Sequence, residues 1–232
     1  MRAISARAVE SVLDSVARGV RVRNPESGRR YWAYVDMSGG SNDDATLAVG
    51  YQDEGRAVVA LVQNQGPPPP FDPHHAVDRF AATCRLYGVQ SVTGDEYAGE
   101  TFKMAFARHG IGFTVAKLST SQLYEALEPR LNARQVVLLD VPEVEQQLLG
   151  LVWRGTKIDH PPGEHDDYAC VVAGVVELVL GRRPSFKLET TSYTKNFIQP
   201  VSGRAVDPAG TRYVGDGTYV TTNGERYRDP RY

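Results

Sequence analysis

The sequence has few cysteines, no long apolar run and little net charge, and each of these absences restricts the classes of protein to which it can belong. Its two cysteines, Cys84 and Cys170, are not part of a Cys-x-x-Cys pair, which excludes the usual cysteine-based zinc and redox motifs. No uncharged apolar run reaches the about 18 residues that a membrane-spanning helix needs; the longest candidate, Tyr168–Leu180, is shorter and contains Glu177. We therefore expect a cytosolic protein with two reduced core thiols and without a membrane span or signal peptide.

The net charge of −2 is not typical of a nucleic-acid-binding protein, but the charge is unevenly distributed. Residues 181–232 contain nine Lys or Arg and five Asp or Glu, so this stretch carries +4 and the remainder −6. Hydrophobic residues make up 41% of the 232 positions, which is enough for a substantial core. We expect one large domain with a basic C-terminal extension.

The hydrophobic pattern predicts closely spaced strands first and alternating strands and helices afterwards. Apolar residues at helical spacing before Gly19 indicate a short N-terminal helix. Three strand-like runs follow, separated by turns with Gly and Asp, as in an antiparallel meander. Alternation after the prolines at 67–70 implies parallel pairing through helical crossovers. The expected strands are 31–36, 45–51, 57–63, 90–93, 112–115 and 136–139, and the expected helices are 74–87, 99–109, 120–131, 143–153 and one that starts near residue 164 or 165.

This order predicts an α/β fold in which three antiparallel strands are followed by parallel strands, with helices flanking a mixed sheet. We divide the chain into an N-terminal helix and connector (1–28), a main domain (29–181) and a polar, basic C-terminal extension (182–232) that forms a hairpin or an irregular tail.

Aspartates occur at three of the expected element boundaries. Asp36 ends a strand, Asp95 follows another, and Asp166 and Asp167 open the last helix. Singly, they are ordinary strand-end, turn and helix N-terminal residues. A strand-end carboxylate points out of the sheet layer, and a carboxylate at a helix start lies over unpaired N–H groups, so the acids could converge on one point. Such a cluster suits a pair of divalent cations, which needs several oxygen ligands from rigid elements.

Three segments around these acids resemble the nuclease domain of the large terminase subunit of tailed bacteriophages, which has a ribonuclease H-like fold. The segments are Tyr34–Asp44, Gly94–Gly99 and His165–Ala169, and the resemblance covers about residues 4–180. It implies an endonuclease that cuts concatemeric double-stranded phage DNA during genome packaging, in the cytoplasm of the infected bacterial host. No Gly-x-x-x-x-Gly-Lys-Ser/Thr phosphate loop occurs in the chain, so the ATPase motor of the large subunit is absent from it.

The resemblance implies that Asp36, Asp95 and one of Asp166 or Asp167 hold two Mg²⁺ or Mn²⁺ ions for phosphodiester hydrolysis. We favour Asp167, because related sequences place a further acid where this chain has Cys170, and Asp167 shares that helical face. Oxygen-only ligands suit hard cations and argue against zinc.

Other residues are expected in supporting roles. Asp44 is a candidate auxiliary metal ligand that acts through water, and His165 a candidate cap of the last helix. Lys117, Arg154 and Lys157 are candidates for DNA phosphate contacts, the last two from the loop before the third acidic motif. The expected partners are double-stranded DNA, the portal protein, the small terminase subunit and a terminase ATPase domain.

Two other classes of function stay open. One is another ribonuclease H-like nuclease, such as a junction resolvase or a ribonuclease acting on RNA–DNA hybrids. The other is a non-catalytic DNA-binding or portal-docking module. The helix before the first strand and the long C-terminal extension favour the terminase type over a minimal ribonuclease, and retention of all three acids disfavours the non-catalytic module.

Overall fold

The computed structural model describes residues 2–3, 6–95, 99–181, 212–215, 218–220 and 226–228, and the chain divides into two compact units, 1–184 and 185–232. In the second unit the described strands form a small antiparallel sheet. These strands are β11 (Arg212–Gly215), β12 (Thr218–Val220) and β13 (Arg226–Arg228), with β12 in the middle. The remainder of the predicted C-terminal extension lies outside the described residues.

A seven-stranded sheet runs through the first unit in the order β2-β8-β5-β4-β3-β6-β7. Its strands are β2 (Val16–Ala17), β3 (Tyr31–Asp36), β4 (Thr46–Asp53), β5 (Arg56–Asn64), β6 (Ser91–Gly94), β7 (Gly112–Val115) and β8 (Val136–Leu139). β3, β4 and β5 pair antiparallel; β6 and β7 extend the sheet in parallel beyond β3, and β8 and β2 do so beyond β5. The predicted mixed sheet is confirmed.

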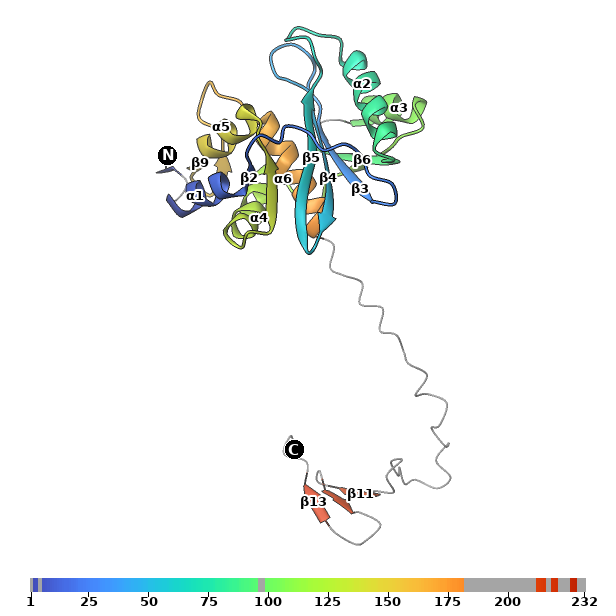
Figure 1. The fold of residues 1–232 in the computed structure, drawn as a ribbon, viewed down its shortest axis with the longest axis vertical. Helices are drawn as coiled ribbons and strands as arrows, with labels where there is room; N and C mark the ends of the chain where they lie inside the picture. Colours follow the sequence, from blue (N-terminus) through green and yellow to red (C-terminus); the bar gives the residue numbers. More distant parts are fainter. Residues whose placement is uncertain are drawn as a thin grey trace. The chain divides into compact units, whose positions relative to one another are not determined.

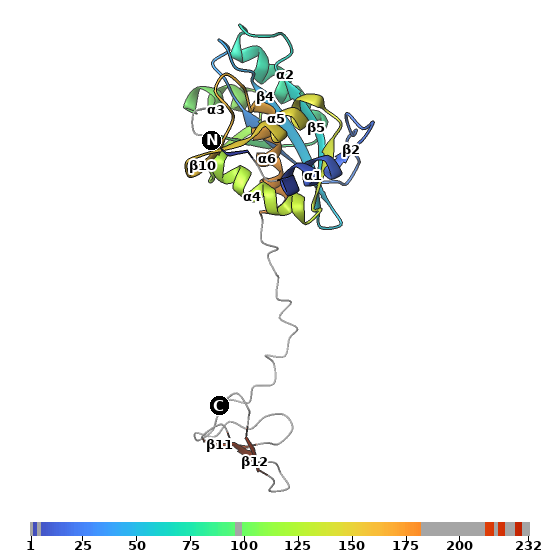
Figure 2. The same ribbon diagram turned by 90° about the vertical axis from the view of Figure 1, so that its left-hand side faces the viewer.

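Helices cover both faces of this sheet (Figures 1 and 2). On one face lie α2 (Pro73–Leu86) and α3 (Gly99–Arg108), whose Phe80 and Phe106 are fully buried. The other face carries α1 (Ala6–Ser15), α4 (Thr120–Asn132), α5 (Pro142–Gly150) and α6 (Asp167–Leu180). α6 lies directly against the sheet and is buried from Ala169 to Val176, which explains its almost uninterrupted apolar sequence.

The described helices include none that is long and apolar enough to cross a membrane. Both cysteines are buried and free of disulfide bonds, as the sequence predicts.

A second small sheet corrects one predicted helix end. The helix predicted over 143–153 ends at Gly150, and β9 (Val152–Arg154) pairs antiparallel with β1 (Arg2–Ala3) and with β10 (Lys157–Asp159). Leu151 already has extended dihedrals, and Gly155 turns the chain with a φ of 66°. Val152 and Trp153 continue the apolar pattern of the helix in sequence but pack as a hairpin strand.

Candidate functional site

Asp36 and Asp95 lie at the same end of two neighbouring parallel strands. β3 ends at Asp36, and its Val35 pairs with Gly94, the last residue of β6. The backbones approach closely here, because a Cβ on Gly94 would lie 2.9 Å from the carbonyl oxygen of Val35 and 2.9 Å from the Phe113 ring. Position 94 therefore requires glycine, and the next residue, Asp95, follows the strand out of the sheet beside Asp36.

Helix α6 packs against β3 in a register that brings its first residues to Asp36. A Cβ on Gly174 would overlap the Tyr34 ring, so the glycine allows the helix to approach the strand there. One turn earlier on α6, the Cys170 thiol donates a hydrogen bond to the Asp36 carboxylate. From Tyr34 to Asp36 the strand advances about 6.8 Å, and from Gly174 back to Cys170 the helix covers about 6 Å. Because these lengths are similar, one register of α6 against β3 allows both contacts.

Burial, together with the charges of neighbouring acids, raises the pKa values of Asp36 and Asp167. The pKa of Asp36 is raised to about 7, mainly by burial; the Cys170 hydrogen bond opposes the shift, and the charges of Asp95, Asp167 and Asp166 add to it. The pKa of Asp167 is raised to about 6 by burial and by Asp166, with His165 opposing the shift. These shifts mean that carboxylates from β3, β6 and α6 interact at one end of the sheet.

Asp166 occupies the N-cap position of α6, but its side chain makes no capping hydrogen bond. The cap comes from α5 instead: Oε1 of Gln147 accepts hydrogen bonds from the backbone N–H groups of Tyr168, at 2.7 Å, and Ala169, at 3.0 Å. Gln147 thus satisfies two of the N–H groups that a helix start leaves open. The prediction that His165 caps the helix is wrong, because Gln147 reaches these groups from outside the local sequence.

Two further side chains hold the start of α6. The hydroxyl of Tyr124, a buried residue of α4, donates to Oδ2 of Asp166 at 2.7 Å. Thr46 pairs with Asp36 in the β3–β4 register, and its hydroxyl donates to the backbone oxygen of Asp167 at 2.9 Å. Neither residue, nor Gln147, has a local sequence signal for this role, because each acts on a segment distant in the chain.

The loop between β3 and β4 contributes two more acids near α6. Asp44 accepts hydrogen bonds from the side-chain amides of Gln65, at 2.7 Å, and Asn64, at 3.3 Å. Nδ1 of His165 lies 3.3 Å from Oδ1 of Asp43 and 4.0 Å from Oδ2 of Asp167. Asp43 and Asp44 also raise the pKa of Asp167, which places this loop at the edge of the cluster.

The predicted phosphate-binding residues lie on two other segments. Lys117 is exposed between β7 and α4. Arg154 and Lys157 are exposed on the β9–β10 hairpin rather than on a loop, and Nη1 of Arg154 lies 3.1 Å from Oδ2 of Asp159. Within the described residues, none of these three forms an ion pair with an acid of the cluster.

In the described part of the chain, no group of three or more His, Cys, Asp or Glu side chains is arranged as a ready-made metal site. The donors that gather at the end of β3 are nevertheless mainly carboxylate oxygens. Among the described residues, no Lys or Arg forms an ion pair with Asp36, Asp166 or Asp167. This excess of negative charge fits a hard divalent cation, which prefers oxygen ligands.

The order and direction of the strands in the mixed sheet, with helices on both faces, correspond to a ribonuclease H-like fold. Comparisons with family models and with curated proteins give no match, whereas solved structures do match. The large terminase nuclease from thermophilic phage G20c with bound magnesium has a TM-score of 0.61 and 18% identity over 76% of this chain and 100% of that one. The Thermus phage P74-26 large terminase nuclease domain has a TM-score of 0.61 and 19% identity, over 75% and 97% of the two chains.

The large terminase of bacteriophage HK97 matches more distantly, with a TM-score of 0.55 and 14% identity over 75% of this chain and 43% of that one. The G20c nuclease has also been solved with bound cobalt and with bound zinc. This chain therefore has the fold of the nuclease domain of phage large terminases, and the predicted resemblance to that domain is confirmed at the level of the fold.

Proposed function

We propose that this protein is a metal-dependent endonuclease that cuts concatemeric double-stranded phage DNA during genome packaging. The main support is the carboxylate of Asp36, half-buried at the end of β3 and surrounded by the charges of Asp95, Asp166 and Asp167. This cluster occurs on a fold shared with terminase nucleases, one of which binds magnesium.

Asp36, Asp95 and Asp167 are the proposed ligands of two Mg²⁺ or Mn²⁺ ions. When bound, such a pair supplies an activated water and stabilises the charge on the leaving 3′ oxygen of a phosphodiester, which leaves a 5′ phosphate and a 3′ hydroxyl. Without a cation, Asp36 retains a proton near neutral pH, so cation binding there displaces a proton and is favoured by higher pH.

Contacts at the start of α6 favour Asp167 over Asp166 as the third ligand. Oδ2 of Asp166 accepts the Tyr124 hydroxyl, which directs this carboxylate toward α4. Asp167 has a side chain that is 16% exposed, and its nearest basic group is the His165 ring at 4.0 Å. Asp167 is therefore the acid of the pair that is better placed to exchange solvent for a cation, while Asp166 positions the helix and adds charge.

Asp44, whose oxygens accept amide hydrogen bonds, is proposed as an auxiliary ligand through water.

Basic residues outside the acid cluster are proposed to contact the DNA. Lys117 and Lys157 are exposed and form no ion pair within the described residues, so both are available to phosphates. Arg154 would exchange its ion pair with Asp159 for a contact with a phosphate group. The guanidinium of arginine suits this contact because it can donate two parallel hydrogen bonds to phosphate oxygens. The proposed partners are the portal protein, the small terminase subunit and a terminase ATPase domain, in the cytoplasm of the infected host.

A plasmid-cleavage assay tests this function. Supercoiled plasmid should be nicked and linearised with Mg²⁺ or Mn²⁺, and cleavage should stop with EDTA and in Asp36→Asn. Cleavage that survives chelation would contradict the metal-dependent mechanism. Parallel assays on a four-way junction and on an RNA–DNA hybrid separate the alternatives: preference for either would favour another ribonuclease H-like nuclease, and no cleavage of any substrate by the folded protein would favour a non-catalytic module.

A further inference from the structure

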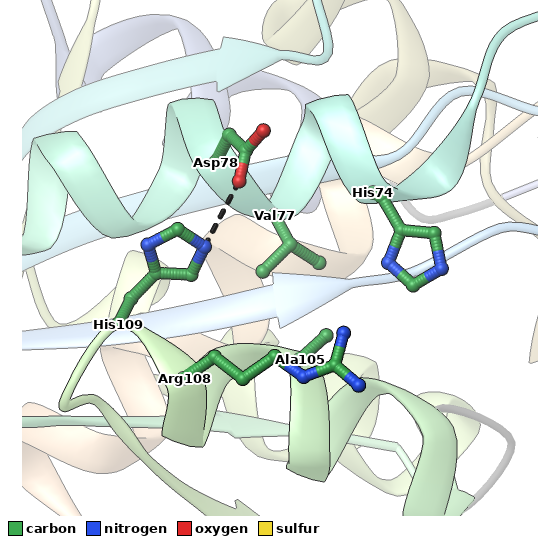
Figure 3. Close-up of a pocket in the computed structure, with 6 residues that line it drawn as sticks. All are labelled: His74, Val77, Asp78, Ala105, Arg108 and His109. Atoms are coloured by element: carbon green, nitrogen blue, oxygen red, sulfur yellow. Dashed lines mark ion pairs between the residues drawn. The ribbon is translucent and has the colours of Figure 1, made fainter.

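A pocket of about 180 Å³ lies between α2 and α3, on the sheet face opposite α6. It is lined by His74, Val77, Asp78, Ala105, Arg108 and His109 (Figure 3). The buried side chains of Val77 and Ala105 form its apolar floor, and the four polar residues surround the opening. None of these residues belongs to the acid cluster.

The polar groups of the pocket are mostly basic. Nε2 of His109 lies 2.9 Å from Oδ1 of Asp78, so the single acid of the pocket is paired with a basic ring. The Arg108 side chain extends along α3, and its guanidinium points toward the end of the pocket where His74 lies, away from the Asp78–His109 pair (Figure 3). Within the described residues, neither the Arg108 guanidinium nor the His74 ring has an ion-pair partner. Two basic groups that face one space without an acid between them favour an anion there.

We propose that this pocket binds a backbone phosphate of double-stranded DNA, with Arg108 as its main contact and His74 as a second donor. Arginine suits this role because its planar guanidinium donates two parallel hydrogen bonds to phosphate oxygens. The inference rests on the proposed nuclease function, because it makes DNA the source of the phosphate. It adds a DNA contact outside the acid cluster and outside Lys117, Arg154 and Lys157.

The pocket is linked to the acid cluster through the start of α2. The backbone N–H of Phe71 donates to the carbonyl oxygen of Gly40 at 2.9 Å, which ties the segment before α2 to the β3–β4 loop. That same loop carries Asp43 and Asp44 at the edge of the cluster. The segment that leads into the His74 end of the pocket is therefore hydrogen-bonded to the loop that carries these two acids.

DNA affinity in EDTA, where cleavage does not interfere, tests the proposal. Fluorescence anisotropy of a labelled 30-base-pair duplex should show a dissociation constant about three- to tenfold higher for Arg108→Ala than for the wild type. The slope of log affinity against log salt should fall by about 0.9, as for one lost phosphate contact. Arg85→Ala makes the same charge change on α2 outside the pocket and should leave both values unchanged. Equal affinity and slope in the two variants would overturn the proposal.

Inorganic phosphate separates a DNA site from a site for a free anion. Phosphate should shift the His74 and His109 ring signals in NMR spectra of the wild type but not of Arg108→Ala. If phosphate shifts these signals while the duplex binds both variants equally, the pocket takes a free anion and the DNA assignment is wrong. Plasmid cleavage by the wild type is measured in parallel. Arg108-dependent DNA binding without cleavage would refute the nuclease function and support the pocket, whereas cleavage without Arg108-dependent binding would do the reverse.

Discussion

Helices α2 and α6 each have an aspartate at the N-cap position, but the two carboxylates have different partners. Asp72 caps its own helix, because its Oδ1 accepts the backbone N–H of His74 at 2.9 Å. Asp166 holds the corresponding position of α6 and makes no capping bond; Gln147 of α5 takes over that role for Tyr168 and Ala169. The position of an aspartate at a helix start thus does not decide what its carboxylate does.

Capping from outside leaves the acids at the start of α6 available for another role. The positive end of the helix dipole still favours negative charge at Asp166 and Asp167. Burial and like charges oppose it, and for Asp167 they dominate, raising its pKa to about 6. An arrangement in which carboxylates repel one another is stabilised by a cation, whereas the Asp72 cap is satisfied by the backbone alone.

The largest difference between the two helix starts should be in catalysis. We expect Asp167→Asn to reduce plasmid cleavage by about 10²- to 10³-fold with the fold intact, because a lost ligand removes stabilisation made at the transition state. Asp36→Asn and Asp95→Asn should reduce plasmid cleavage to a similar extent, also with the fold intact. Asp166→Asn should keep measurable activity, since asparagine retains an oxygen for the Tyr124 hydroxyl. Cleavage rates measured beside circular dichroism spectra check this, and an inactive Asp166→Asn with a fully active Asp167→Asn would reverse the assignment.

The next largest effect should be on the pH dependence of stability in EDTA. The pKa of Asp36 is about 7 in the folded protein and about 3.9 in an unfolded chain, so the folded state binds more protons between these values. The free energy of unfolding should therefore fall as pH rises from about 4 to 7, by up to about 4 kcal/mol for this group before solvent screening reduces it. Asp167 adds a smaller fall in the same direction up to about pH 6.

Asp36→Asn should flatten this pH profile and be more stable than the wild type at pH 8 in EDTA. Urea unfolding between pH 4 and 8 measures both effects. Identical profiles for the variant and the wild type would mean that Asp36 titrates like an exposed acid, which would remove the electrostatic basis of the site.

A moderate effect is expected from removal of the external cap. Gln147→Ala should lower the free energy of unfolding by about 1–2 kcal/mol, the usual cost of a lost helix cap. It should also lower the cleavage rate at saturating DNA, because the start of α6 is then free to move or to be capped by Asp166. Gln147→Glu keeps the accepting oxygen and should recover the lost stability, but it adds a negative charge next to Asp167 and therefore serves as a control for the cap alone. Equal cleavage by Gln147→Ala and the wild type would show that the cap has no influence on the acids.

The smallest effect should come from the ordinary cap of α2. Asp72→Ala should cost about 1 kcal/mol, which lowers the melting temperature by about 2–4 °C in a protein of this size, and should leave cleavage unchanged. Asp72→Asn retains a capping oxygen and serves as the control. A loss of cleavage in Asp72→Ala would mean that the two helix starts do not differ in the way proposed.

The sequence predicts the elements whose signals are local. The sequence predicts β3 over 31–36, and the strand forms there, because its apolar run is bounded by Arg30 and the glycines after Ser38. The end of α5 could not be predicted in this way, since Val152 and Trp153 fit a further helical turn and only pairing with β10 makes them a strand.

The same distinction holds for the candidate site. Asp36, Asp95 and the Asp166-Asp167 pair stand at element ends, which the sequence marks, and the structure brings their charges together. Gln147 and Tyr124 act on α6 from other helices, 21 and 42 residues away in the chain, so no local pattern identifies them. The helical spacing places Cys170 on the same face as Asp167, but its hydrogen bond to Asp36 depends on the packing of α6 against β3.

Anomalous scattering from crystals grown with Mn²⁺ tests the central claim most directly. If the acids at the end of β3 and the start of α6 form a two-metal site, two manganese peaks should lie about 4 Å apart, contacted by carboxylate oxygens of Asp36, Asp95 and Asp167. Crystals of Asp36→Asn should lose at least one of these peaks. Manganese bound only by Asp43 and His165, or no peak near Asp36 at millimolar Mn²⁺, would contradict the proposed site.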